Sequence, residues 1–106
     1  MYARILEFVP KLERREEFIH VIDRRIRSIL KQQHGCVDTL LMFQINSDKA
    51  LVISLWKEQT YAEPYEREWF PKVQEIMKPY LTAPVRVSYY MVENAQAEQL
   101  ERVLVD

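Results

Sequence analysis

The hydrophobic pattern in the first third of the chain changes from a strand period to a helical one. Residues 2–9 are mostly β-branched, aromatic or aliphatic and stop at Pro10, which predicts a first strand. From about 12–33, apolar side chains recur at helical spacing and charged side chains occupy the rest of the wheel. The apolar positions are Phe18, Ile19, Ile22, Ile26, Ile29 and Leu30. We therefore expect one amphipathic helix, closed by His34 and Gly35 at a C-terminal cap.

The middle of the chain predicts a β-hairpin. Two runs of strand-type residues, 36–45 and 50–56, are separated by the polar residues 46–48. Asparagine, serine and aspartate side chains hydrogen-bond to the nearby backbone and favour tight turns. The two runs should therefore pair as neighbouring antiparallel strands.

A second helix and a last strand follow the hairpin. Aromatic and aliphatic residues recur at helical spacing from about 61–80, where Pro64 and Pro71 predict a kink or restart near Phe70. Residues 85–92 have the composition of a strand. The resulting β-α-β-β-α-β order predicts a ferredoxin-like α+β fold, in which an antiparallel four-stranded sheet carries its helices on one face.

The chain divides into one domain and a tail. We assign residues 1–94 to the domain, because no linker interrupts them. Residues 95–106 form a C-terminal tail with apolar residues at helical spacing, which predicts a short docked helix.

Both faces of the predicted sheet carry apolar side chains. In the hairpin, one parity holds Val37, Leu41, Phe43 and Ile45, and the other holds Leu40 and Met42. Two helices can cover only one face, so the other needs a second layer. A two-fold copy of the same sheet is the simplest partner, and we expect a homodimer. The alternative is that the tail folds across the open face of a monomer.

Composition and charge exclude several classes of protein. Fifteen basic and sixteen acidic residues give a net charge of −1, which argues against nucleic-acid binding. Cys36 is the only cysteine, and no cysteine or histidine spacing suits a structural metal. No run approaches the ~18 apolar residues of a membrane span, and the N-terminus lacks the apolar core of a signal peptide. We expect a cytoplasmic protein that neither binds nor crosses membranes.

The stretch VISLWKEQTYAEPYEREWFPKVQEIMKPYL resembles the strand, tryptophan and aromatic helix of the antibiotic biosynthesis monooxygenase (ABM) family. The element order of residues 2–92 agrees with that family. The resemblance implies a dimeric α+β barrel. Some members oxygenate aromatic or quinol-like substrates without metal or flavin, by removing a proton so that the substrate anion reacts with dioxygen. In such a mechanism the protein supplies a pocket, a base and a group that stabilises the anion, and no cofactor.

The resemblance also suggests roles for particular residues. Trp56 would shape the pocket wall, and Arg86 would stabilise an enolate or phenolate. Arg86 is a charged residue within an apolar strand, so it needs a partner, a ligand or solvent. The candidate residues for contacting a substrate are Tyr65, Trp69, Tyr90 and Gln44. Packing in the core is the competing explanation for the aromatic stripe of the second helix.

Three functions remain open. The first is a cofactor-independent, ABM-like monooxygenase acting on a small aromatic or quinol-like substrate. The second is a non-catalytic or stress-associated dimer that binds a small hydrophobic or aromatic ligand, because fold does not fix function. The third is a proton-transfer isomerase. Haem degradation by relatives of this fold is disfavoured, because it needs an axial histidine that the second helix lacks.

Overall fold

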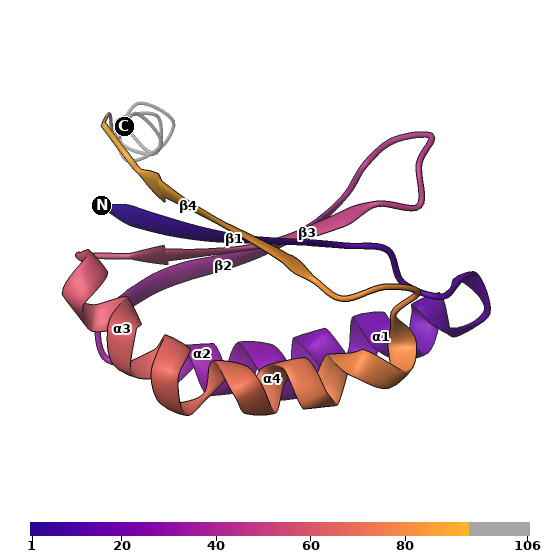
Figure 1. The fold of residues 1–106 in the computed structure, drawn as a ribbon, viewed down its shortest axis with the longest axis horizontal. Coiled ribbons are helices and arrows are strands. Elements are labelled where there is room, and N and C mark those ends of the chain that lie inside the picture. Colours follow the sequence, from indigo (N-terminus) through magenta and orange to yellow (C-terminus); the bar gives the residue numbers. More distant parts are fainter. Residues whose placement is uncertain (94–106) are drawn as a thin grey trace, which may run out of the picture.

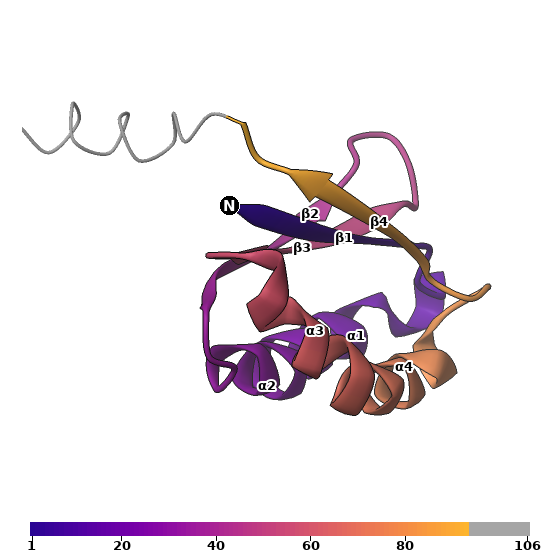
Figure 2. The same ribbon diagram turned by 60° about the vertical axis from the view of Figure 1, so that its left-hand side comes forward.

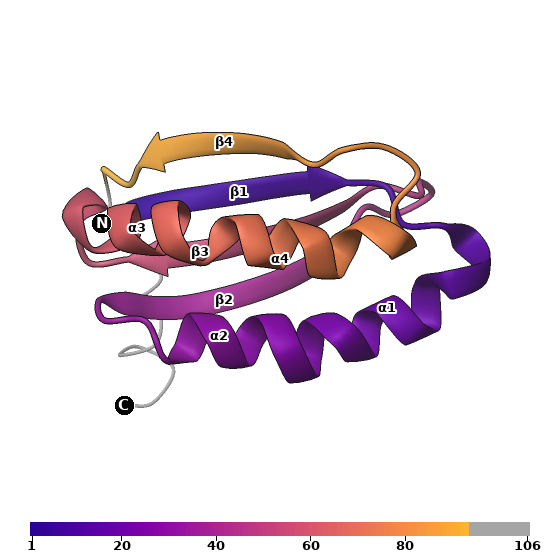
Figure 3. The same ribbon diagram turned by 60° about the horizontal axis from the view of Figure 1, so that its bottom comes forward.

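The computed structural model describes residues 1–93, which form an antiparallel sheet with every helix on one face (Figures 1 and 3). The strands are β1 (Tyr2–Phe8), β2 (Cys36–Phe43), β3 (Ala50–Trp56) and β4 (Arg86–Met91). They lie in the order β2-β3-β1-β4, with β2 and β4 at the edges. The predicted ferredoxin-like order is therefore confirmed. The predicted tail lies outside the described residues, and no helix within them is long and apolar enough to span a membrane.

The first helical segment is continuous in direction but not uniform in winding. A short 3-10 turn, η1 (Leu12–Arg14), leads into α1 (Arg15–Val21), a π-helical turn η2 (Ile22–Ile26) and α2 (Arg27–Lys31). The buried residues of this segment are Phe18, Ile22, Ile26 and Leu30. Four-residue spacing on an α-helix drifts by about 40° per step. The wider π turn opposes that drift, so the stripe keeps facing the sheet.

The second helical segment breaks where the sequence predicts. α3 (Gln59–Glu68) ends at Trp69, and α4 (Phe70–Met77) begins with Pro71 in its first turn. Proline has no N–H to donate and restricts the residue before it, so an unbroken helix is disfavoured there. A 3-10 turn, η3 (Lys78–Tyr80), completes the segment.

The strand register separates two faces of the sheet. On β1 the side chains of Tyr2, Arg4, Leu6 and Phe8 are buried on the helix side. Arg4 lies opposite Ser54 on β3 and Tyr89 on β4. The other parity, which includes Ile5, forms the open face, and no element of residues 1–93 covers it (Figure 2). The sheet is therefore apolar on both sides, as the sequence predicts.

Candidate functional site

A groove of about 520 Å³ lies at one edge of the sheet, between α3 and the C-terminal end of β4. Figure 3 shows that α3, the start of β1 and the end of β4 meet at the same end of the molecule. The groove is lined by Tyr2, Gln59, Glu66, Tyr89, Tyr90 and Met91. Three tyrosines and one carboxylate therefore gather in a single depression. The rings of Tyr2 and Tyr89 stack, with centroids 6.2 Å apart.

A fully buried arginine lies behind the groove. Arg4 has 0% exposure, and its Nη2 donates a hydrogen bond to Glu66 Oε1 at 3.2 Å. Its guanidinium carbon is 4.5 Å from the ring centre of Phe70, 5.2 Å from Tyr65 and 5.8 Å from Tyr89. Aromatic faces attract cations, so these rings partly replace the water that Arg4 has lost. One carboxylate and three rings therefore hold the buried charge.

Glu66 connects this arginine to the groove. Its Oε1 accepts hydrogen bonds from Arg4 Nη2 and from the Tyr89 hydroxyl, which makes a very close contact. Its Oε2 has no hydrogen-bond partner among the described residues, and the side chain is 33% exposed. Burial, followed by the hydrogen bond to Glu66, raises the pKa of Tyr89, so this phenol stays protonated at neutral pH. Glu66 thus offers the groove one free carboxylate oxygen.

Three buried polar atoms beside this cluster have no partner within residues 1–93. They are Nε and Nη1 of Arg4 and the hydroxyl oxygen of Tyr65. Burial raises the pKa of Tyr65 to about 12, against the opposing effect of the Arg4 charge. Tyr65 therefore remains a hydrogen-bond donor at any physiological pH. Buried polar groups are rarely left unpaired, so these donors mark a place that suits an acceptor.

Trp56 and Tyr65 form the rear wall of the cluster. Both side chains are buried, and their ring centroids are 5.5 Å apart. Trp56 Nε1 donates a hydrogen bond to Ser54 Oγ at 3.0 Å, so its polar edge is satisfied within the core. Neither residue lines the groove. Their predicted contact with a substrate stays a prediction.

The other predicted site residues are more scattered. Tyr90 lines the groove, on the side of the sheet away from the helices. Trp69 lies at the break between α3 and α4, and its ring is covered by Lys72 Nζ at 4.6 Å. Gln44 is exposed in the hairpin, at the opposite end of β3 from Trp56. The structure therefore does not bring Trp69 or Gln44 to the groove.

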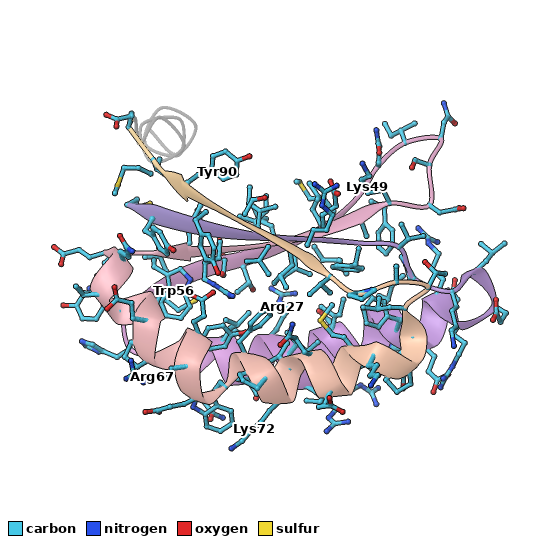
Figure 4. All side chains as sticks on the ribbon, in the orientation of Figure 1. Arg27, Lys49, Trp56, Arg67, Lys72 and Tyr90 are labelled. Carbon is cyan, nitrogen blue, oxygen red and sulfur yellow. The ribbon has the colours of Figure 1, made fainter. Side chains whose placement is uncertain are left out.

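Arg86 lies on the open face, away from the buried cluster. Its side chain is 83% exposed and pairs with Glu7 at 3.7 Å, and Lys49 approaches the same carboxylate at 3.4 Å. Trp56 points to the helix side instead, as Figure 4 shows. The two residues that the sequence placed together as catalytic are thus separated by the sheet.

Arg4 and Glu66 are not among the site residues predicted from the sequence. A signal for Arg4 was available, because it shares parity with Tyr2, Leu6 and Phe8, which form the apolar side of the first strand. A charged residue on that parity must be buried with a partner. Arg86 shares parity with Ser88 and Tyr90, the mixed side of its strand. Glu66 carried no comparable signal, since it is one of several acidic residues on its helix.

No family model matches the sequence, and no curated protein matches it. Solved structures do share its fold. A protein from Deinococcus radiodurans that carries the antibiotic biosynthesis monooxygenase name superposes with a TM-score of 0.76 at 12% identity, over 90% of this chain and 95% of its own. SnoaB, a cofactor-independent oxygenase from Streptomyces nogalater, gives 0.74 at 14% identity, over 89% and 94% of the two chains.

A third similar structure contains a bound molecule. The monooxygenase ActVA-Orf6 of Streptomyces coelicolor, in complex with the ligand nanaomycin D, gives a TM-score of 0.66 at 10% identity, over 89% of this chain and 88% of that one. Identities this low establish the fold alone. The resemblance of the sequence to the ABM family is therefore confirmed at the level of the fold.

Proposed function

We propose that this protein is a cofactor-independent, ABM-type monooxygenase that acts on a small aromatic or quinol-like substrate in the tyrosine-lined groove. The proposal rests on the position of Glu66. One of its oxygens is held by Arg4 and Tyr89, the other has no hydrogen-bond partner among the described residues, and the side chain lines the groove. A carboxylate fixed beside a substrate site is suited to act as a general base.

The groove suits a flat aromatic molecule. Tyr2 and Tyr89 present stacked rings, and Met91 adds an adaptable apolar side chain. Gln59 and the tyrosine hydroxyls supply the few polar groups that orient a ligand in such sites. The cofactor-independent oxygenase SnoaB and the monooxygenase ActVA-Orf6 share the fold, which supports an oxygenase.

The chemistry requires a base and dioxygen. Glu66 Oε2 accepts a proton from the reacting carbon or from a conjugated hydroxyl, which leaves a delocalised anion. The anion gives one electron to dioxygen, and the resulting radical and superoxide combine to form a carbon–oxygen bond. Glu66 returns its proton to the distal oxygen. The hydroperoxide then loses water as the O–O bond breaks and the carbon gives up its second hydrogen as a proton. A carbonyl group remains on the substrate.

We also propose that the protein is a homodimer joined through the open face. Leu40 and Met42 are 47% and 42% exposed there, and they lie opposite Ile53 and Leu51 on β3. Contiguous apolar patches of this kind are uncommon on monomers. A second copy would bury them sheet against sheet.

A binding protein is the second candidate. The position of Arg86 favours it, because an exposed arginine paired with Glu7 supplies no anion stabilisation near Trp56. On the helix side, Glu66 can serve as the base and Arg4 as the group that stabilises an anion. We therefore place the oxygenase first. The same carboxylate would also serve a proton-transfer isomerase, which differs in consuming no dioxygen.

Oxygen uptake by metal-stripped protein tests the proposal against a panel of hydroquinones, anthrones and related phenols. We expect uptake above autoxidation, and we expect Glu66→Gln to lower it by about a hundredfold or more, as loss of a general base does. Glu68→Gln is the matched control, because Glu68 lies on the same helix with its side chain 64% exposed. Ligand binding without uptake would favour the binding protein. Oxygen uptake that is unchanged in Glu66→Gln would show that Glu66 is not the base.

A further inference from the structure

The unpaired donors behind the groove suit a smaller ligand than the groove does. Arg4 and Tyr65 are 0% and 1% exposed, so the ring of a substrate in the groove stays outside, and only a small group that projects inward from it would reach their free polar atoms. Glu66 and Tyr89 both line the groove, and Glu66 binds Arg4 directly. Burial this complete limits any ligand at these donors to a few atoms. The positive charge and the free N–H and O–H groups favour an anion.

The charge balance of the cluster changes during the proposed reaction. In the resting protein the Glu66 carboxylate neutralises Arg4 across 3.2 Å. When Glu66 accepts a proton from the substrate, the buried guanidinium loses its counter-charge. An uncompensated buried charge is strongly unfavourable. Superoxide forms at the next step, so a new anion arises just when Arg4 needs one.

We propose that Arg4 and Tyr65 form a buried oxyanion site that holds superoxide, and then the peroxide oxygen, during turnover. This inference rests on the proposed function, whose oxidant is dioxygen. The electron passes from the substrate anion to dioxygen, and Arg4 Nε, Arg4 Nη1 and the Tyr65 hydroxyl donate hydrogen bonds to the reduced oxygen. Such preorganised donors stabilise charge that develops in the transition state. Arg4 is then a catalytic residue, and Trp56 positions Tyr65 by packing against it.

Azide tests the site without any oxidisable substrate, because it is a small linear monovalent anion like superoxide. Its binding is followed by the infrared stretch of azide, which differs between water and a buried site. Glu66→Gln removes the competing negative charge and mimics the protonated base. We expect this variant to bind azide at least about tenfold more tightly than the natural protein.

Further substitutions in the Glu66→Gln background assign the binding to this site. Tyr65→Phe removes one hydroxyl and should weaken azide binding by about three- to tenfold. Arg4→Gln should abolish the buried infrared band. Arg67→Gln is the matched control, since Arg67 lies on the same helix with its side chain 68% exposed and points away from the sheet (Figure 4), and it should leave binding unchanged. Circular dichroism and thermal melting verify folding.

The outcomes separate this inference from the proposed function. Tighter azide binding in Glu66→Gln that is lost on Tyr65→Phe supports the anion site even when no substrate is oxygenated. Equal azide binding in Glu66→Gln and the natural protein overturns the anion site. The free donors would then be hydrogen-bonded to a buried water instead. If Arg4→Gln does not fold, Tyr65→Phe alone decides, because unchanged affinity in that variant also overturns the proposal.

Discussion

At the scale of single residues, Arg4 lowers the stability of the fold but provides a charge that catalysis can use. Taking a guanidinium out of water is expensive, and a single carboxylate with part of its surface in solvent returns only some of that energy. Phe70, Tyr65 and Tyr89 supply attractive ring faces, but they do not accept the N–H groups on Nε and Nη1. A stable core would be better served by leucine at this position. The arginine therefore has the features of a functional residue.

Cys36 should lower the stability of the folded protein at alkaline pH. Burial raises the pKa of its thiol from 9.0 to about 11. Between those values the unfolded chain loses the proton and the folded chain keeps it, so the free energy of unfolding falls as pH rises. Tyr65, whose pKa is raised from 10.0 to about 12, extends the fall.

The measurement is the urea unfolding free energy from pH 7 to pH 11. We expect a decline that begins near pH 9 and is smaller in Cys36→Ala. A decline of equal size in Cys36→Ala would show that the thiol does not cause it.

At the scale of elements, alternation along the strands predicted more than residue type did. The hairpin, the order of elements and the break near Phe70 follow from periodicity, turn residues and proline, and all of them are confirmed. The same alternation separates Arg4 from Arg86, two arginines that composition treats alike. The groove could not be predicted, because Glu66 and Tyr89 meet only once β4 pairs with β1 and α3 packs beneath that edge.

The junction between α2 and β2 depends on one glycine. Gly35 has φ of +85°, a backbone conformation that other residues adopt at a cost of roughly 1–2 kcal/mol. A Cβ at this position would also collide with the side chain of Tyr61. The α3 helix therefore packs against the junction only when residue 35 has no side chain.

We expect Gly35→Ala to lower the free energy of unfolding by at least about 1–2 kcal/mol, measured by chemical denaturation. Gln32→Ala is the control, because Gln32 is exposed just before the same junction and its own change should be small. Equal stability of the two variants would mean that the left-handed backbone and the Tyr61 contact impose no constraint.

At the scale of the whole molecule, the open face is the surface through which we propose that two copies assemble. Leu40 lies on β2 opposite Ile53, well inside the exposed apolar area. A lysine there would be buried against a second copy, at a large desolvation cost. The Leu40→Lys variant should therefore be monomeric at micromolar concentration, while Gln74→Lys on the helix side should remain dimeric.

Analytical ultracentrifugation gives the mass of each variant. A monomeric natural protein would contradict the dimer and would leave the C-terminal tail as the candidate cover for the open face. A dimeric Leu40→Lys would place the interface elsewhere on the surface.

Our main proposal for the whole protein is that Glu66 starts the transfer of oxygen from dioxygen to an aromatic substrate in the tyrosine-lined groove. Its most direct test is mass spectrometry of the product after turnover of an anthrone under isotopically labelled dioxygen. We expect one labelled oxygen atom in the new carbonyl with the natural protein and with Glu68→Gln, and almost none above background with Glu66→Gln. Product without label, or equal labelling in Glu66→Gln, would contradict it.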